Sequence, residues 1–286
     1  MKRILYYFCL CAFSTQLVAS EPGIQYFQKH QYQKSQQYFA VLLKQNKKNV
    51  LAHYYLGRSL FQMGQYRHAA TSLLQASNLR PDQSRYHYWL ARAYGESARY
   101  SNFIRQAFLA PKIRRGFEAA VRLNPESIDA RIGLANYYMQ APRMMGGSKA
   151  LALQQATAIS KLDAVEGQLI VALIYERQKK NKEAENIYRR LIKWHGIKKQ
   201  YAHIYDHYGA LLLNQKRYPD SLAMYKKQIL LVPNKDEAYV SMGRALQKMR
   251  QYKKALEFYQ RALAINQYNR QARSRMKVLI IQLAED

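Results

Sequence analysis

The sequence predicts an all-α protein built from stacked helical hairpins. The same small and aromatic residues return at equivalent places along the chain, and in the last two units their spacing is 34 residues. The equivalent sets are Gly57, Gly209 and Gly243, then Tyr66, Tyr218 and Tyr252, then Ala69, Ser221 and Ala255. A small residue lets two helices cross closely, and an aromatic residue fills the gap beside it. Such a hairpin cannot bury its apolar face alone, so it must stack on its neighbours.

The fold class that follows is a right-handed superhelical solenoid of about seven helical hairpins plus a C-terminal capping helix. No alternating strand pattern and no linker rich in Ser, Gly or Pro interrupts residues 21–286, which we expect to form one solenoid. The hairpins are expected at about 24–49, 50–83, 84–127, 128–164, 165–198, 202–235 and 236–269, and the capping helix at 270–283.

Two hairpins are longer than the period allows. The third has about ten additional residues within Arg99 to Lys112. Because proline disfavours a helix interior, Pro111 predicts that this insertion ends before the second helix begins. The fourth is interrupted by APRMMGGS, from Ala141 to Ser148. Insertions in repeat proteins occur on one side, often a binding side, so we expect both to mark a functional edge.

The amino-terminal residues are typical of a secretory signal. Lys2 and Arg3 precede an uncharged run from Ile4 to Ala19, and small residues lead up to Ser20. A membrane anchor is the alternative, but the run is shorter than the ~20 residues that a spanning helix needs. We therefore expect residues 1–20 to be cleaved near Ser20, leaving a periplasmic or secreted protein. Both cysteines lie in this segment, which excludes thiol chemistry and disulfides from the mature chain.

The chain is strongly basic, with a formal net charge of +28. The charge is concentrated between Arg244 and Lys277, a stretch that contains ten basic residues and one acidic residue, Glu257. Such a surface attracts anionic lipid, glycan or nucleic acid. The alternative is an ordinary solvated face in a protein from a basic proteome.

These repeats resemble the tetratricopeptide repeat family. The match covers nearly all of the mature chain and is strongest in 50–83, 202–235 and 236–269. The stretch ARIGLANYYMQAPRMMGGSKALAL, from Ala130 to Leu153, also resembles a subfamily of secreted bacterial tetratricopeptide proteins with a Pro-Gly-Gly loop. That resemblance implies neither an enzymatic activity nor an assigned partner.

The resemblance also implies that the residues lining the concave groove come from the first helix of each hairpin. Carried over onto this sequence, it gives the candidate partner-binding residues Tyr54, Arg58, Arg85, Tyr88, Arg92 and Asn136. Tyr54/Arg58 and Tyr88/Arg92 repeat a Tyr/Arg pair at a spacing of four, which places each pair on one helical face. Arginine binds carboxylates bidentately, so an acidic partner segment is favoured. The Lys/Asn clamp of the chaperone-binding members is absent at these positions.

No constellation points to catalysis, a cofactor or a metal. The Gly146–Lys149 turn lacks the glycine spacing and the preceding strand of a phosphate loop, and Ser148 is expected to cap the next helix. His203 and His207 have a metal-compatible spacing, but the Glu of the helical zinc-protease motif is missing. We expect them to be ordinary histidines near a groove.

Two functional hypotheses remain. The first is a non-enzymatic periplasmic scaffold that binds a segment of an envelope protein in its concave groove. The second is an envelope-surface binder whose basic C-terminal third docks on anionic lipid, glycan or nucleic acid. Salt separates them, because polyanion binding weakens steeply as salt rises.

Overall fold

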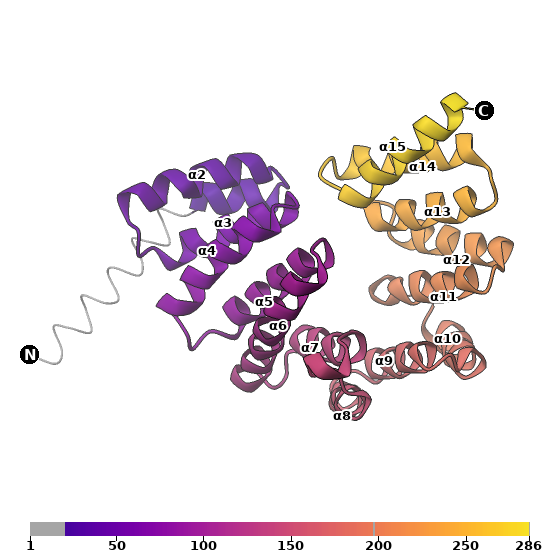
Figure 1. The fold of residues 1–286 in the computed structure, drawn as a ribbon, viewed down its shortest axis with the longest axis horizontal. Coiled ribbons are helices and arrows are strands. Elements are labelled where there is room, and N and C mark those ends of the chain that lie inside the picture. The colour runs from indigo at the N-terminus through magenta and orange to yellow at the C-terminus, as the bar shows by residue number, and fades with distance from the viewer. Residues whose placement is uncertain (1–20, 197, 286) are drawn as a thin grey trace, which may run out of the picture. The chain divides into compact units, whose positions relative to one another are not determined.

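The structure is a computed structural model that describes residues 21–196 and 198–285. The expected signal, residues 1–20 with its two cysteines, lies outside the described residues. The helices group into two compact units, one up to Gln155 and one from Ala156 (Figure 1).

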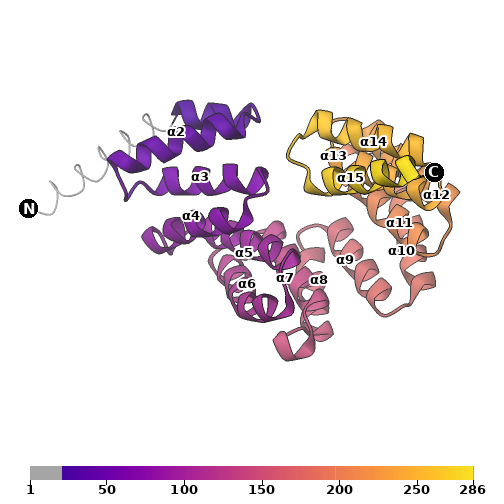
Figure 2. The same ribbon diagram turned by 45° about the horizontal axis from the view of Figure 1, so that its top comes forward.

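The first unit is a succession of helices joined by short turns. Residues 21–28 are helical, and the following elements are α2 (Tyr32–Gln45), α3 (Val50–Gln62), α4 (Tyr66–Leu79), α5 (Ser84–Arg99), α6 (Phe103–Leu123), α7 (Ile128–Gln140) and the 3-10 turn η1 (Arg143–Met145). Helices adjacent in sequence pack on one another, and α3, α4 and α5 form successive layers (Figure 2). The first helices of the hairpins also touch in turn, α3 with α5 and α5 with α7.

The second unit repeats this plan. The helix α8 (Lys149–Ser160) contains the division between the units, and it is followed by α9 (Ala164–Arg177), α10 (Asn181–His195), the turn η2 (Lys199–Tyr201), α11 (His203–Asn214), α12 (Tyr218–Leu231), α13 (Asp236–Lys248), α14 (Tyr252–Ile265) and α15 (Arg270–Glu285). The last helix packs on α14 and buries Ala272 and Leu279 completely. No strand occurs among the described residues. The predicted all-α solenoid class is confirmed. Of the helices described, none has the length and apolar character needed to cross a bilayer.

Three hairpins show a close approach between their two helices at a glycine. At Gly57, a β-carbon would lie 2.6 Å from Leu73 Cγ and 3.1 Å from the Ala69 carbonyl oxygen. At Gly209 and Gly243, it would lie 2.6 Å from a ring carbon of Tyr225 and Tyr259. Both rings are fully buried. The periodic glycines are therefore required because no side chain fits between the crossing helices.

The corners of the hairpins adopt the left-handed backbone conformation. Gly64 does so with φ of 73°, as suits a residue without a β-carbon. His30, Lys179, Lys216 and Arg250 are non-glycine residues with φ between 58° and 63°, and all four are exposed. The corner therefore keeps its left-handed backbone conformation in hairpins where another residue replaces the glycine.

The first insertion is helical, and the predicted break at Pro111 is wrong. The helix α6 runs continuously from Phe103 to Leu123 with Pro111 inside it. Asn102 caps its start by accepting a hydrogen bond from the Arg105 amide at 3.0 Å. Leu109, Ala110 and Ile113 are buried on both sides of the proline, so packing offsets the ~3 kcal/mol that an interior proline typically costs. The Ala107 carbonyl, which loses its usual donor, belongs to an exposed residue that water can reach.

The second insertion is a compact, tied loop. The Tyr137 hydroxyl donates to the Met145 carbonyl, and the Ser148 amide donates to the Tyr138 carbonyl at 2.9 Å. Gly146 takes a φ of 90°, and a β-carbon at Gly147 would lie 1.8 Å from the Ala141 oxygen. Ser148 accepts from the Leu151 amide at 3.3 Å, which confirms its predicted role as a helix cap.

The close approach at Gly57 makes a testable prediction about stability. Overpacking a core typically costs about 1–3 kcal/mol, so Gly57→Ala should lower the free energy of unfolding of the first unit by this amount. Gly95 is the matched control, because it lies within α5 and a β-carbon there meets nothing within 4 Å. Since alanine is favoured over glycine in a helix interior, Gly95→Ala should raise stability by up to ~1 kcal/mol. Urea unfolding of both variants tests this; shifts of the same sign would contradict it.

Candidate functional site

A cavity lies between α5, α6 and α7, within the first unit. Its volume is about 750 Å³, within the range of roughly 300–1,000 Å³ that is usual for ligand pockets. The first helices of two successive hairpins, α5 and α7, supply most of its polar side chains. The lining includes Tyr88, Arg92, Glu96 and Arg99 from α5, Gln106, Ile113 and Phe117 from α6, Asp129, Asn136, Tyr137 and Gln140 from α7, and Pro142 and Met145 after it.

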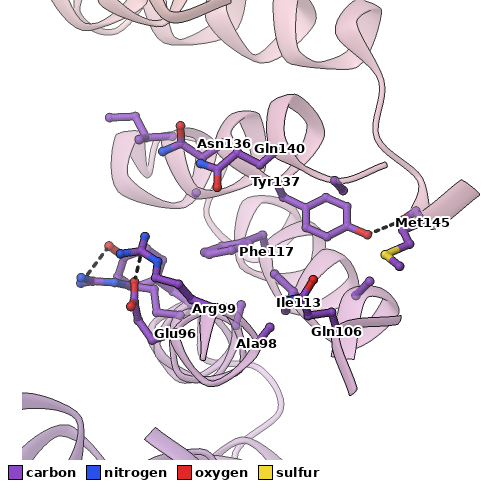
Figure 3. A pocket seen from close by; sticks show the side chains of 18 of the residues that line it. Glu96, Ala98, Arg99, Gln106, Ile113, Phe117, Asn136, Tyr137, Gln140 and Met145 are labelled. Atoms are coloured by element: carbon purple, nitrogen blue, oxygen red, sulfur yellow. Dashed lines mark hydrogen bonds and ion pairs between the residues drawn. The ribbon is translucent and has the colours of Figure 1, made fainter. Parts of the chain in front are cut away.

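Both insertions reach this cavity. Gln106 and Ala110 belong to the additional part of α6, and Ala141, Pro142 and Met145 belong to the inserted loop. Figure 3 shows Gln106 and Met145 on the same side of the site, with the Tyr137 hydroxyl directed at the Met145 backbone. The tied geometry of the loop therefore fixes part of the cavity wall.

The chemistry of the wall is mixed. Phe117 and Ile113 give it an apolar floor, and Asn136 and Gln140 project from α7 opposite Glu96 and Arg99 (Figure 3). Glu96 and Arg99 form an ion pair at 3.4 Å. Burial raises the pKa of Tyr88, and likewise that of Tyr137, so both hydroxyls remain neutral hydrogen-bonding groups at neutral pH. Amide and hydroxyl groups around an apolar floor suit a peptide segment, whose backbone needs both donors and acceptors.

Two arginines meet beside the cavity on one indole ring. The Arg58 guanidinium carbon lies 4.2 Å from the centre of the Trp89 ring, and that of Arg92 lies 4.5 Å from it. Arg58 also lies 4.6 Å from the Phe27 ring, and Arg92 lies 5.0 Å from the Phe61 ring. Arg58 and Arg92, which occupy equivalent places in adjacent hairpins, therefore both contact Trp89.

These guanidiniums lack acidic partners. Within the described part of the chain, neither Arg58 nor Arg92 has a carboxylate at ion-pair distance. Their polar contacts are to Tyr54 and Tyr88, at 3.3 and 3.5 Å. The Nε of Arg58 is buried and has no hydrogen-bond partner. No carboxylate of the described residues therefore neutralises either guanidinium by an ion pair.

The predicted site residues separate into two groups. Tyr88, Arg92 and Asn136 line the cavity, whereas Tyr54, Arg58 and Arg85 do not. The sequence treats Tyr54 as a groove position, but its side chain is only 5% exposed, because it packs on Tyr86 of the next hairpin. Arg85 is exposed and donates to the Tyr86 hydroxyl at 3.1 Å.

Trp89 is the main residue that sequence reasoning missed. It lies three residues before Arg92, so the two share a helical face, and that spacing could have indicated the contact. Met145 and Gln106 were not predictable individually, since they lie in insertions where the repeat gives no register.

His203 and His207 both lie on α11, within the second unit. His203 Nε2 lies 2.9 Å from a Glu166 carboxylate oxygen, and burial lowers the pKa of His207. The search of the described residues finds no group of three or more side chains placed to hold a metal ion.

Comparisons with known proteins agree with this architecture. Residues 26–93 and residues 236–269 match tetratricopeptide repeat family models. The crystal structure of a tetratricopeptide repeat protein from Parabacteroides merdae is similar with a TM-score of 0.63 and 16% identity, over 93% of this chain and 99% of that one. A thermophilic tetratricopeptide repeat protein of Thermus thermophilus has a TM-score of 0.53 and 18% identity, over 69% of this chain and 99% of that one. The search of curated proteins gave no match.

The matched residues are tetratricopeptide repeats, and the fold of the chain is that of tetratricopeptide repeat proteins. This fold is a scaffold for protein–protein interaction, and members of the family bind peptides or proteins and are generally not enzymes.

The stacking of Arg58 changes what its removal should do. The sequence alone suggests that truncating this arginine leaves stability unchanged, but the guanidinium packs on three aromatic rings. Desolvated cation–π contacts are worth up to about 2 kcal/mol, so Arg58→Ala should lower the free energy of unfolding by ~1–2 kcal/mol. Arg67→Ala, at an exposed position on α4, should stay within about 0.5 kcal/mol of the wild type. Equal denaturation midpoints for the two variants would refute the structural role of the stack.

Proposed function

We propose that this protein is an exported, non-enzymatic scaffold that binds a segment of another envelope protein in the cavity between α5, α6 and α7. The observation that carries the proposal is the convergence of both insertions on a cavity whose polar side chains come from the first helices of two successive hairpins. Solenoid proteins bind partners on the surface that such helices form.

The segment should carry an acidic group. Arg92 lines the cavity and has no carboxylate partner within the described residues. Arg58 contacts the same indole ring, that of Trp89. An arginine already stacked on a ring is preorganised, so little conformational entropy is lost when it binds a carboxylate. Apolar side chains of the segment would contact Phe117 and Ile113.

Site-specific photo-crosslinking tests the location of binding. A photoreactive amino acid at Gln140, inside the cavity, should give a discrete crosslinked partner in cells. The same amino acid at Arg67, on α4 and outside the cavity, is the matched control. Equal crosslinking from both positions, or none from Gln140, would contradict binding in the cavity.

Two substitutions then test the chemistry with the captured partner. Gly95 lines the cavity with open space beside it, so Gly95→Leu should obstruct the cavity and abolish capture, while Gly95→Ala should not. Arg92→Gln should weaken binding at least tenfold, because a lost Arg–carboxylate contact typically costs about 2–5 kcal/mol and ~1.4 kcal/mol is a factor of ten. Full binding by Gly95→Leu would refute the proposal.

The alternative is docking on a polyanion through the basic C-terminal third. Arg261, Arg270 and Arg273 are among its exposed basic residues. The variant Arg261→Gln, Arg273→Gln separates the two functions when its binding to the captured partner is measured at increasing salt concentration. A steep loss with salt, and dependence on these residues rather than on Arg92, would favour the alternative.

Export is part of the proposal and rests on the amino-terminal sequence alone. Amino-terminal sequencing of the protein from the envelope fraction should find a start near Glu21. An intact Met1 in the cytosol would refute export.

A further inference from the structure

The additional turns of α6 have two faces with different surroundings. One face lies against the first unit, where Leu109 and Ala110 are buried and Gln106 lines the cavity. Away from this face, the same turns carry Phe103, Ile104 and Phe108, which are 59%, 79% and 60% exposed. Ile104 and Phe108, at positions i and i+4, share one side of the helix, and Phe103 borders them at its first residue. We call these three exposed side chains the α6 patch. Isolated exposed apolar residues are ordinary, but a contiguous aromatic and aliphatic patch marks an interaction surface.

The chain that carries the α6 patch is rich in basic residues, and the acids that flank it, Glu96 and Glu118, pair with Arg99 and Arg114. Residues 97–117 contain five basic residues and no acidic one. Among the described residues, Arg105, Lys112 and Arg115 form no ion pair, and all three are exposed. The Lys112 ammonium nitrogen lies 4.0 Å from the centre of the Phe108 ring, so positive charge directly borders the apolar side chains.

We propose that the α6 patch docks this protein on the surface of an anionic lipid bilayer. Aromatic and aliphatic side chains bordered by Lys and Arg are the composition of helices that lie in the membrane interface. The apolar side chains enter the boundary between headgroups and acyl chains, while the basic residues contact lipid phosphates.

A protein partner fits this surface less well. A stable protein interface buries about 1,200–2,000 Å² in total, with roughly 20–30 residues on each side. The α6 patch offers three large apolar side chains at the start of one helix, next to concentrated positive charge. A bilayer requires no matching shape and supplies negative charge over its whole surface, so a small patch suffices for reversible docking.

The two faces of α6 give the docking a consequence. Since Gln106 lines the cavity from the turns that carry Phe103 and Phe108, docking holds one wall of the cavity close to the lipid headgroups. The cavity would then meet partner segments that emerge near the bilayer surface. Docking itself does not depend on the proposed partner binding.

Vesicle co-sedimentation tests the proposal with the mature chain. The wild type should bind vesicles containing phosphatidylglycerol and should bind pure phosphatidylcholine vesicles at least tenfold less. The double variant Phe103→Ser, Phe108→Ser should lose binding by about tenfold or more, since burial of large apolar side chains supplies the insertion energy. The double variant Val278→Ser, Ile281→Ser is the matched control, because these aliphatic residues of α15 are also half exposed but lie in the other unit. The triple variant Arg105→Gln, Lys112→Gln, Arg115→Gln should lose the preference for anionic vesicles.

Several outcomes would overturn the proposal. If the wild type does not bind anionic vesicles, the proposal is wrong. Full binding by Phe103→Ser, Phe108→Ser, or an equal loss in the α15 control, would place docking elsewhere. If the α6 double variant loses a protein partner in the absence of lipid but keeps its vesicle binding, the patch is a protein interface. Gly95→Leu should bind vesicles like the wild type, which distinguishes this test from that of the cavity.

Discussion

The close approach of two helices at a glycine is the contact on which the rest of the molecule depends. Where Gly57 faces Leu73, and Gly209 and Gly243 face buried tyrosine rings, even one β-carbon would meet heavy atoms at less than 3 Å. That distance sets the crossing of each helix pair and therefore the direction in which the next hairpin stacks. The layer of first helices in the first unit, α3, α5 and α7, inherits its spacing from these crossings. A cavity lined by α5 and α7 is thus a product of contacts in the hydrophobic core.

The sequence predicted the hairpins well because the period reports directly on helix packing. A residue that recurs with the repeat occupies the same environment each time, so the glycines and their facing rings could be recognised without coordinates. Ser148 could be recognised as a cap because capping is local. Tyr88, Arg92 and Asn136, which the family resemblance assigns to the concave groove, line the cavity.

The failures occurred where the environment depends on a neighbour that the period does not specify. Tyr54 and Tyr88 are equivalent in the repeat, yet Tyr54 is buried against Tyr86, while Tyr88 borders an open cavity widened by the insertions. Pro111 was read as a helix end from its local preference, but tertiary packing on both sides of it decided otherwise. Insertions have no equivalent in other repeats, so the contributions of Gln106 and Met145 required the structure.

The additional turns of α6 carry both a part of the cavity lining and the exposed apolar side chains of the α6 patch. The helix lines the cavity with one side and carries exposed apolar side chains on another. It keeps the two in a fixed relation because its backbone hydrogen bonds are internal. The loop from Ala141 to Ser148 is rigid for a different reason, since its backbone and the Tyr137 hydroxyl form a closed set of hydrogen bonds. Both insertions thus extend the scaffold with ordered structure.

The left-handed corners at His30, Lys179, Lys216 and Arg250 have a consequence for how this chain could change over time. A non-glycine residue in this conformation typically carries about 1–2 kcal/mol of backbone strain. Among the described residues, the strain is distributed over four exposed corners, none of which lines the cavity. Substitutions that relieve this strain would therefore make the chain more heat-resistant, or offset destabilising changes at the cavity, without altering a residue that lines it.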